Sequence, residues 1–167
     1  MSPAARRVWK LIGEIGFWKG VGRLHAQLYR LTGGRIGHRA GGLTNLLLTT
    51  TGRRSGRQRT VPLTYMADGD GYVLVASNGG ADRDPAWWLN LERQPTATVQ
   101  VGSETRDVVA CQADAAERAR LWPKLKAMNP FYARYETLTE REIPVVILRP
   151  LAGPARASAG ARGSSTT

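Results

Sequence analysis

From residue 43 to residue 150, the apolar residues occur in short runs separated by glycine, proline, asparagine and aspartate. Short apolar runs that are bounded by turn-forming residues predict β-strands rather than helices. The expected strands are Leu43–Thr51, Arg59–Met66, Tyr72–Ser77, Thr96–Val101, Glu104–Gln112 and Ile143–Arg149. Most of the connections are short enough for hairpins, and long alternation of strand and helix is missing. We therefore expect an α+β protein that is mainly β, namely a small antiparallel β-barrel of about six strands with flanking helices.

Two helices are predicted inside this strand-rich region. Asp84-Pro85 is typical of an N-cap residue followed by proline at the first helical position, and the helix would end before Pro95. Asp114, with Glu117 three residues later, has the pattern of a capping box and predicts a helix that continues to Met128. These two segments would supply the flanking helices.

The first 42 residues follow another pattern, in which apolar positions recur at helical spacing among basic residues. They hold eight Lys or Arg and one acid, Glu14, together with large aromatics such as Trp9 and Trp18. Glycines interrupt the pattern near Gly16–Gly20, so we expect two short amphipathic helices rather than one long helix. A basic, tryptophan-bearing amphipathic segment can lie on an anionic bilayer, and it can equally pack on the domain with its basic face in water. Both interpretations stay open.

The chain is thus expected to divide into three parts. A basic amphipathic helical segment spans 1–42, a β-barrel domain spans 43–150, and a tail spans 151–167. The tail is rich in Ala, Gly, Ser and Arg and cannot bury enough apolar surface to fold, so we expect it to be disordered.

Composition adds a strong positive charge. Of the 167 residues, 24 are Lys or Arg and 13 are Asp or Glu, which gives a net charge of +11. Such an excess indicates a small anionic ligand, a nucleic acid or an anionic membrane surface as partner. Tryptophan and tyrosine are not interleaved with the basic residues as base-stacking requires, so we do not expect a nucleic acid. The single cysteine, Cys111, excludes a disulfide framework and a cysteine-rich metal site.

The hydropathy of the sequence indicates in which cellular compartment the protein is expected. No stretch approaches the roughly 20 apolar residues that cross a bilayer, and the N-terminus lacks the apolar core of a signal peptide. We expect a cytoplasmic protein, with peripheral contact at the inner face of the cell membrane if residues 1–42 bind lipid.

The stretch Thr49–Pro62 carries the sharpest functional signal. Gly52 and Gly56 punctuate a turn between two predicted strands, and seven residues hold four arginines without an acid: Arg53, Arg54, Arg57 and Arg59. Guanidiniums this close repel one another unless an anion lies among them, and each can donate paired hydrogen bonds to a phosphate or carboxylate. A solvated basic hairpin is the alternative, but the position between two buried strands favours an anion site.

Residues for nucleophilic or metal chemistry are missing from the pattern. His25 and His38 lack an acid spaced to orient them, and Ser55 lacks a visible base, so we expect neither a metal site nor a serine hydrolase. A protein without such a set, but with a ligand cleft, indicates that a bound cofactor carries the reaction.

Three segments indicate such a cleft: the flexible loop Asn78–Ala81, the pair Trp87-Trp88 in the predicted helix, and Tyr132 with Tyr135. Adjacent helical residues point about 100° apart, so one tryptophan can face the cleft, although two core tryptophans are the ordinary arrangement. Tyr132 and Tyr135 are three residues apart and share a helical face.

Longer segments resemble the deazaflavin-dependent nitroreductase family, the actinobacterial split β-barrel oxidoreductases that use coenzyme F-420. They read TTTGRRSGRQRTVPL, VASNGGADRDPAWWLNLERQP and WPKLKAMNPFYARYETLTEREIPVVILRP, in order from about Leu46 to Pro150. The resemblance implies a split barrel of flavin-reductase type and hydride transfer from the reduced deazaflavin to a small-molecule acceptor. FMN is the less favoured cofactor.

The resemblance also implies the site. The phosphate and oligoglutamate tail of the cofactor would be held by Arg53, Arg54, Ser55 and Arg59. The deazaflavin ring would be bordered by Thr60, Val61, Pro62, Leu63, Val75, Ala76, Ser77 and Asn78, and on its other side by Ala86, Trp87, Trp88, Leu89 and Asn90. The hydroxyls that would place or protonate the acceptor, and so act as catalytic residues, are those of Ser77, Tyr132 and Tyr135.

The first hypothesis is therefore an F-420-dependent reductase of quinone-like, enone or nitro acceptors. Menaquinone is favoured because residues 1–42 would bring the site to the membrane. A non-catalytic carrier of F-420 or a flavin is the first alternative, and a basic membrane-surface or nucleic-acid binding module is the second. The sequence is also compatible with a homodimer.

Overall fold

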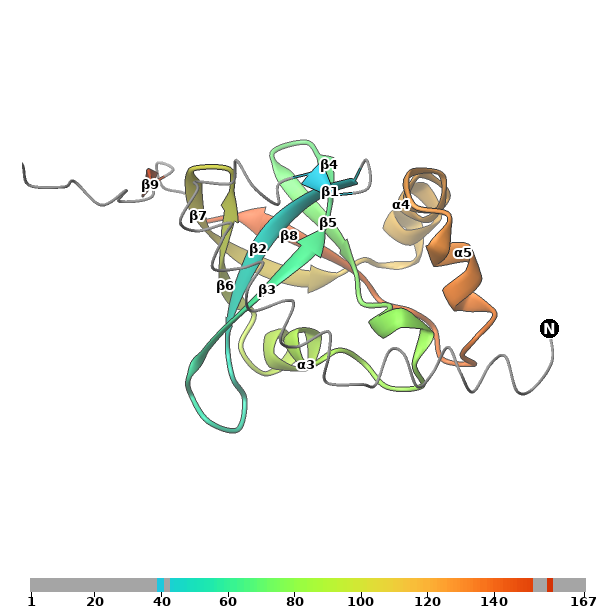
Figure 1. The fold of residues 1–167 in the computed structure, drawn as a ribbon, viewed down its shortest axis with the longest axis horizontal. Helices are drawn as coiled ribbons and strands as arrows, with labels where there is room; N and C mark the ends of the chain where they lie inside the picture. Colours follow the sequence, from blue (N-terminus) through green and yellow to red (C-terminus); the bar gives the residue numbers. More distant parts are fainter. Residues whose placement is uncertain (1–38, 41–42, 152–155, 158–167) are drawn as a thin grey trace, which may run out of the picture.

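The computed structural model describes residues 39–40, 43–151 and 156–157. Within them, the strands form one nine-stranded antiparallel sheet in the order β1-β2-β6-β7-β8-β5-β4, with β3 paired to β2 and β9 to β7 (Figure 1). The strands are β1 Arg39–Ala40, β2 Leu43–Thr51, β3 Gln58–Thr64, β4 Met66–Asp68, β5 Gly71–Val75, β6 Thr96–Val101, β7 Glu104–Gln112, β8 Val145–Pro150 and β9 Arg156–Ala157. The described helices are the 3₁₀ helix η1 Asn78–Gly80 and the α-helices α3 Ala86–Arg93, α4 Ala115–Met128 and α5 Phe131–Glu136.

The sheet curls so that the strands at its two ends, β3 and β4, follow each other in the chain. β3 pairs with β2, β4 pairs with β5, and only Tyr65 separates β3 from β4. The Tyr65 N–H donates a hydrogen bond to the Thr44 carbonyl at 3.1 Å, at the point where the chain passes from one end of the sheet to the other. The single strand predicted over Arg59–Met66 is therefore wrong, because the chain breaks at Tyr65 and changes its pairing partner there from β2 to β5. Since β2 is the only described strand that pairs with β3, the barrel is open along β3.

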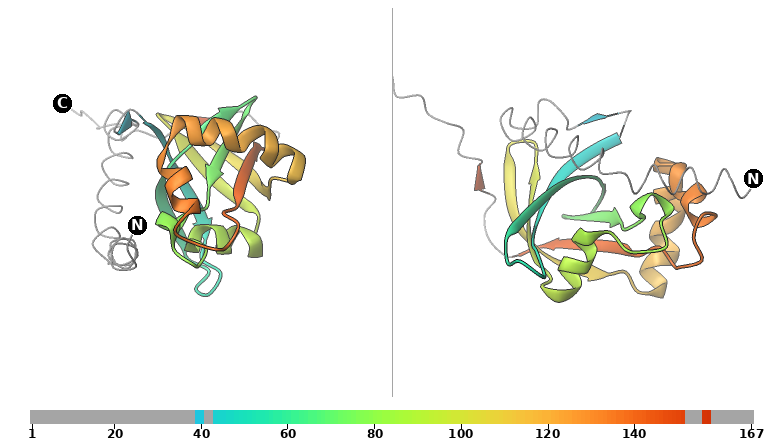
Figure 2. Two further views of the ribbon diagram at one scale, coloured as in Figure 1. Left: turned by 90° about the vertical axis from the view of Figure 1, so that its right-hand side faces the viewer. Right: turned by 60° about the horizontal axis from the view of Figure 1, so that its bottom comes forward.

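β5 and β8 are buried on both faces, which explains their uninterrupted apolar sequences. Leu74 and Val146 lie in a first core, formed with β2, β6, β7 and α3. Val73 and Ile147 point the other way, into a second core formed with α4 and α5. Figure 2 shows α4 and α5 together on one side of the sheet, away from α3. The expected antiparallel barrel with flanking helices is confirmed.

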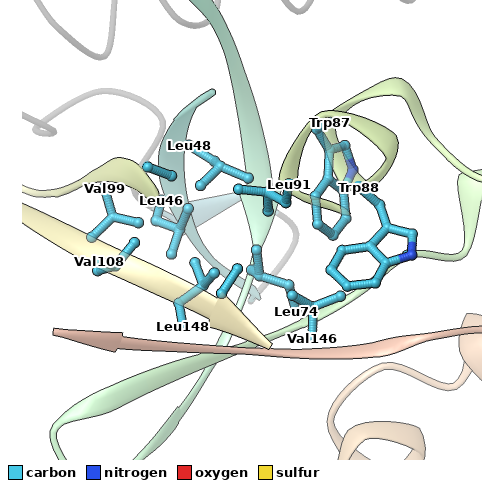
Figure 3. Packing of buried hydrophobic residues seen from close by; sticks show 13 residues of the cluster. Leu46, Leu48, Leu74, Trp87, Trp88, Leu91, Val99, Val108, Val146 and Leu148 are labelled. Carbon is cyan, nitrogen blue, oxygen red and sulfur yellow. The ribbon is translucent and has the colours of Figure 1, made fainter. Parts of the chain in front are cut away.

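α3 closes the first core with two tryptophans. Trp87 and Trp88 are 7% and 5% exposed, and both belong to the first core. Their indoles pack with Leu91 beside Leu74 and Val146 (Figure 3). The ordinary arrangement of two core tryptophans is thus the one observed.

Most element boundaries agree with the sequence. β2, β6 and β7 have the predicted bounds. The capping box of α4 is formed, because the Glu117 N–H donates to the Asp114 carboxylate at 2.8 Å and the Asp114 N–H donates to the Glu117 carboxylate at 3.1 Å. The predicted N-terminal helices lie outside the described residues, as does most of the predicted disordered tail. Two short stretches beside those parts, Arg39–Ala40 and Arg156–Ala157, pair with β2 and β7. No helix in the described ranges is long and apolar enough to span a membrane.

Candidate functional site

The turn between β2 and β3 is closed by its own backbone. The Gly52 N–H donates to the Arg57 carbonyl at 2.9 Å, and the Gly56 N–H donates to the Gly52 carbonyl at 2.8 Å. Gly56 has a φ of +62°, which favours glycine. A Cβ on Gly52 would lie 2.9 Å from the Ser55 Oγ and 3.1 Å from the Arg57 carbonyl oxygen, so any larger residue there would displace part of the turn. The turn, hereafter the arginine turn (residues 52–59), therefore presents its side chains from a fixed loop.

The arginine turn carries positive charge that the described residues do not neutralise. Arg53, Arg54, Arg57 and Arg59 are all exposed. None of the four pairs with a carboxylate of the described residues, although ion pairs form elsewhere in the same part of the chain. Guanidiniums without carboxylates are a donor set for phosphate and carboxylate ligands. The turn thus fits the phosphate and glutamate tail of F-420.

A buried amide on α3 holds this turn in place. Asn90 is 5% exposed, and its Oδ1 accepts from the Arg53 backbone N–H at 3.1 Å and from the Arg53 guanidinium at 3.4 Å. Its Nδ2 donates to the hydroxyl of buried Thr50 at 3.1 Å. Asn90 was predicted to contact the cofactor ring, and its amide here supports the arginine turn.

β3 offers an open backbone edge next to the turn. Residues 60–63 are half-buried, and the Val61 and Leu63 side chains pack against the first core. Pro62 has no N–H to donate and is tolerated because β3 is an edge strand among those described. The Thr60 hydroxyl is bonded to the Thr49 hydroxyl at 2.8 Å. The edge of β3 opposite β2 pairs with no other described strand.

The chain leaves β5 through the buried residues Ala76 and Ser77. Ser77 is 8% exposed, and its hydroxyl has no hydrogen-bond partner among the described residues. The loop that follows was predicted to be flexible, but it forms η1. Asn78 adopts a φ of +47°, an uncommon conformation for a residue with a side chain, and its Nδ2 donates to the Arg83 carbonyl at 3.0 Å.

An arginine that the sequence did not single out organises this loop. Arg141 donates to the carbonyls of Ala76, Ser77 and Ala81 and to the carboxylate of Asp84, over distances of 2.7 to 3.0 Å. The predicted N-cap role of Asp84 is wrong. Pro85 occupies the N-cap position of α3, and the Asp84 side chain pairs with Arg141 instead. The hydrogen-bond partners of Arg141 lie 57 to 65 residues before it in the sequence, so no local pattern could have indicated that it organises this loop.

The two predicted tyrosines lie on α5, and their ring centroids are 6.4 Å apart. Tyr132 is 5% exposed in the second core and stacks on Trp122. Burial raises the pKa of Tyr132, against a smaller opposing effect of its hydrogen bond with Asn129. Burial also raises the pKa of half-buried Tyr135. Both phenols therefore keep their protons at neutral pH and can donate hydrogen bonds.

α5 lies against η1, the loop after Ser77. A Cβ on Gly80 would come within 3.0 Å of the Leu138 side chain and 3.3 Å of the Tyr135 carbonyl. The structure thus connects Ser77, Tyr135, Arg141, the start of α3, Asn90 and the arginine turn through successive contacts. Of the predicted ring neighbours on α3, Ala86 is exposed and Leu89 half-buried, whereas both tryptophans lie in the core.

The chain is similar to known proteins over most of its described length. Residues 21–150 match the model of the F-420H(2)-dependent quinone reductase family. An F-420H(2)-dependent quinone reductase of Mycobacterium tuberculosis is 45% identical over 130 residues, which cover 75% of this chain and 87% of the relative.

Two solved structures share the fold. An F-420-dependent reductase (FDR-A) is 39% identical with a TM-score of 0.58, and the match covers 63% of this chain and 93% of that chain. A domain-swapped dimer is 34% identical with a TM-score of 0.62, covering 76% of this chain and 94% of that chain. These findings confirm the expected split barrel, an enzyme, and coenzyme F-420 as its cofactor. The chain belongs to the F-420H(2)-dependent quinone reductase family and is an oxidoreductase that uses coenzyme F-420.

Proposed function

We propose that this protein transfers a hydride from reduced F-420 to a quinone, with menaquinone as the favoured acceptor. The observation that carries the proposal is the arginine turn, whose four exposed guanidiniums have no carboxylate partner among the described residues. Such a donor set suits a cofactor with a phosphate and a glutamate tail. The names of the family and of the mycobacterial relative support a quinone as the acceptor.

The arginine turn acts as the anchor of the cofactor. Arg54 and Arg59 present exposed guanidiniums that pair with no carboxylate in the described part of the chain, and Ser55 adds a hydroxyl that also accepts from the Arg57 N–H at 3.4 Å. Arg53 uses one guanidinium N–H for Asn90 and keeps its other N–H groups for a ligand. Because Asn90 also fixes the Arg53 backbone, the anchor is held in place before the ligand arrives.

The open edge of β3 and the end of β5 border the ring. Backbone groups of residues 60–63 would bond its polar edge, with Val75, Ala76 and Ser77 on the facing side. Trp87 and Trp88 would act from within the core by fixing α3, and Ala86 and Leu89 would offer the exposed contacts. When bound and reduced, F-420 supplies a hydride, which carries two electrons.

A quinone that receives a hydride also needs a proton to become a hydroquinone. The Ser77 and Tyr135 hydroxyls make no hydrogen bond to other described residues, so each can bond to a carbonyl oxygen of the acceptor. Tyr135 keeps its proton at neutral pH because burial raises its pKa. It can therefore donate that proton to the acceptor oxygen and regain one from solvent. Tyr132, buried beneath it, orients Tyr135 through ring contact.

The menaquinone preference depends on residues 1–42, which lie outside the described residues. Their basic, tryptophan-bearing sequence would bring the site to the anionic membrane in which menaquinone dissolves. Removal of residues 1–38, which leaves β1 in place, should then abolish sedimentation with anionic liposomes and leave turnover of a water-soluble menaquinone analogue intact. The expected homodimer is supported by the domain-swapped dimer among the similar structures, and sedimentation velocity would test it.

The proposal is tested with a panel of acceptors under anaerobic conditions. Reduced F-420 is mixed with the protein and a quinone, an enone or a nitro compound, and the visible absorbance of the oxidised deazaflavin is followed. We expect the fastest return of absorbance with the menaquinone analogue. Tight binding of F-420 without turnover of any acceptor would instead indicate a carrier of the cofactor, and the proposed reaction would be wrong.

A further inference from the structure

Arg141 is the described side chain with the most connections around the predicted site. Its side chain is 16% exposed. Its Nε donates to the Ala81 carbonyl at 2.9 Å, and one terminal nitrogen donates to the Asp84 carboxylate at 2.7 Å. The other terminal nitrogen donates to the carbonyls of Ala76 and Ser77 at 3.0 and 2.9 Å. One guanidinium thus ties together the whole segment from the end of β5 to the start of α3.

These bonds impose an unusual backbone path. Ala76 and Ser77 are consecutive, yet their carbonyl oxygens accept from the same nitrogen of Arg141. Consecutive carbonyls of an extended strand point in opposite directions, so the strand has to end here, and Ser77 adopts a helical φ of −69° and ψ of −31°. The chain then passes through positive φ values at Asn78, Gly79 and Gly80. Such a path persists only where its surroundings fix it, and Arg141 supplies four of the fixing bonds.

The path determines where two hydroxyls lie relative to each other. Ser77 is at the beginning of the segment, and Gly80 near its end packs against Leu138 and the Tyr135 carbonyl. Arg141 therefore sets the position of Ser77 against α5, which carries Tyr135. Through Asp84 it also fixes the approach to α3, whose Asn90 holds Arg53 of the arginine turn.

We propose that Arg141 is a positioning residue, which aligns the acceptor hydroxyls of Ser77 and Tyr135 with the cofactor anchored at the arginine turn. This inference deepens the proposed function and rests on it. Four of the five N–H groups of Arg141 are directed to Ala76, Ser77, Ala81 and Asp84, so its role would be to hold the segment and not to bind a ligand. A lysine could not replace Arg141. Its ammonium is one compact group, whereas the three nitrogens of the guanidinium donate at the same time to three carbonyls and one carboxylate.

The experiment compares Arg141→Ala and Arg141→Lys with the control Arg120→Ala. Arg120 lies on α4 and, like Arg141, donates to a carboxylate of a distant segment, because two of its nitrogens donate to the Asp68 carboxylate on β4 at 2.7 Å each. Asp84→Asn is a milder variant, because it removes the charge of one partner and leaves the three carbonyl bonds of Arg141. Each protein is assayed well below its unfolding temperature for F-420 affinity, by fluorescence, and for quinone turnover.

Both Arg141 variants should lower kcat/KM for the quinone about 100-fold, because a misplacement of about 1 Å at a reacting centre can cost that much. The dissociation constant of F-420 should change by less than about fivefold, because Asn90 still holds the arginine turn. Asp84→Asn should fall between these variants and the wild type, and Arg120→Ala should match the wild type. Equal turnover in Arg141→Ala and Arg120→Ala would overturn the proposal.

Amide hydrogen exchange gives a readout that does not depend on turnover. In the wild type, bound F-420 should slow exchange at residues 76–81 and at residues 52–57. In the Arg141 variants, the slowing at 76–81 should be lost and that at 52–57 retained. Slowing at both segments in Arg141→Lys would show that the guanidinium is dispensable, even if the wild type turned over no quinone. If Arg141→Ala does not fold, Arg141→Lys and Asp84→Asn decide the question in the same two assays.

Discussion

Substitution of an arginine in the arginine turn should change the affinity for F-420 without changing the free energy of unfolding. Arg54 is exposed and has no partner among the described residues, so Arg54→Ala removes nothing that holds the fold together. Its free energy of unfolding should stay within about 0.5 kcal/mol of the wild type. The variant does lose one or two charge-assisted hydrogen bonds to the cofactor, worth about 1.5–3 kcal/mol, so the dissociation constant of F-420 should rise roughly 10- to 150-fold.

Asn90→Ala should affect both quantities. It removes two hydrogen bonds from Arg53 and one to Thr50, and Thr50 is only 1% exposed. Buried groups left without a partner cost about 1–3 kcal/mol each, and we expect a loss of about 2–4 kcal/mol in the free energy of unfolding. F-420 should also bind more weakly, because the Arg53 backbone is no longer held by α3.

Urea denaturation and a fluorescence titration with F-420 measure the two quantities on the same samples. Lys124→Ala is the control, because it removes one exposed positive charge on α4, away from the turn. The titrations are repeated at high salt, which should weaken binding by the wild type more than by Arg54→Ala. The reasoning is refuted if Arg54→Ala binds F-420 as tightly as Lys124→Ala does.

Three further changes test other parts of the account. Tyr135→Phe should slow quinone reduction about 100-fold. In a pH–rate profile, the wild type should lose turnover at a pH above the ordinary tyrosine pKa, where Tyr135 loses its proton, and the variant should not show this loss. The raised pKa of Tyr135 also means that its contribution to stability is complete below pH 10.0, the unfolded value, and is lost as pH rises through the folded value, so Tyr135→Phe should flatten the alkaline fall in unfolding temperature. Gly80→Ala combines a φ of +80° with a Cβ 3.0 Å from Leu138, and calorimetry should show a loss of about 1–3 kcal/mol. Asp114→Ala removes the α4 capping box and should cost about 1 kcal/mol in urea denaturation without a change in F-420 affinity.

The strands could be predicted because their causes are local. β2, β6 and β7 are bounded by turn residues, and their apolar runs match the observed limits. The break at Tyr65 could not be predicted, because the Thr44 carbonyl that its N–H bonds lies on another strand. The run of apolar and β-branched residues looks continuous there, and only the closure of the sheet interrupts it.

The candidate site divides in the same way. The arginine turn is a local cluster, and its charge and glycines are visible in the sequence. Asn90 and Arg141 act over long sequence separations, so their supporting roles became visible only in the fold. At Asp84 a local pattern gave a wrong prediction. An acid before Pro85 predicted a helix cap, but the Asp84 carboxylate instead forms a tertiary ion pair with Arg141.

The most direct test of the central claim is a stoichiometric measurement of hydride transfer. Reduced F-420, the protein and a water-soluble menaquinone analogue are mixed without oxygen, and oxidised deazaflavin and hydroquinone are quantified together. We expect one hydroquinone for each oxidised deazaflavin, at a rate proportional to protein, with Arg54→Ala slower at low cofactor and restored at saturating cofactor. Oxidation of the cofactor without hydroquinone, or no oxidation while F-420 is bound, would contradict the account.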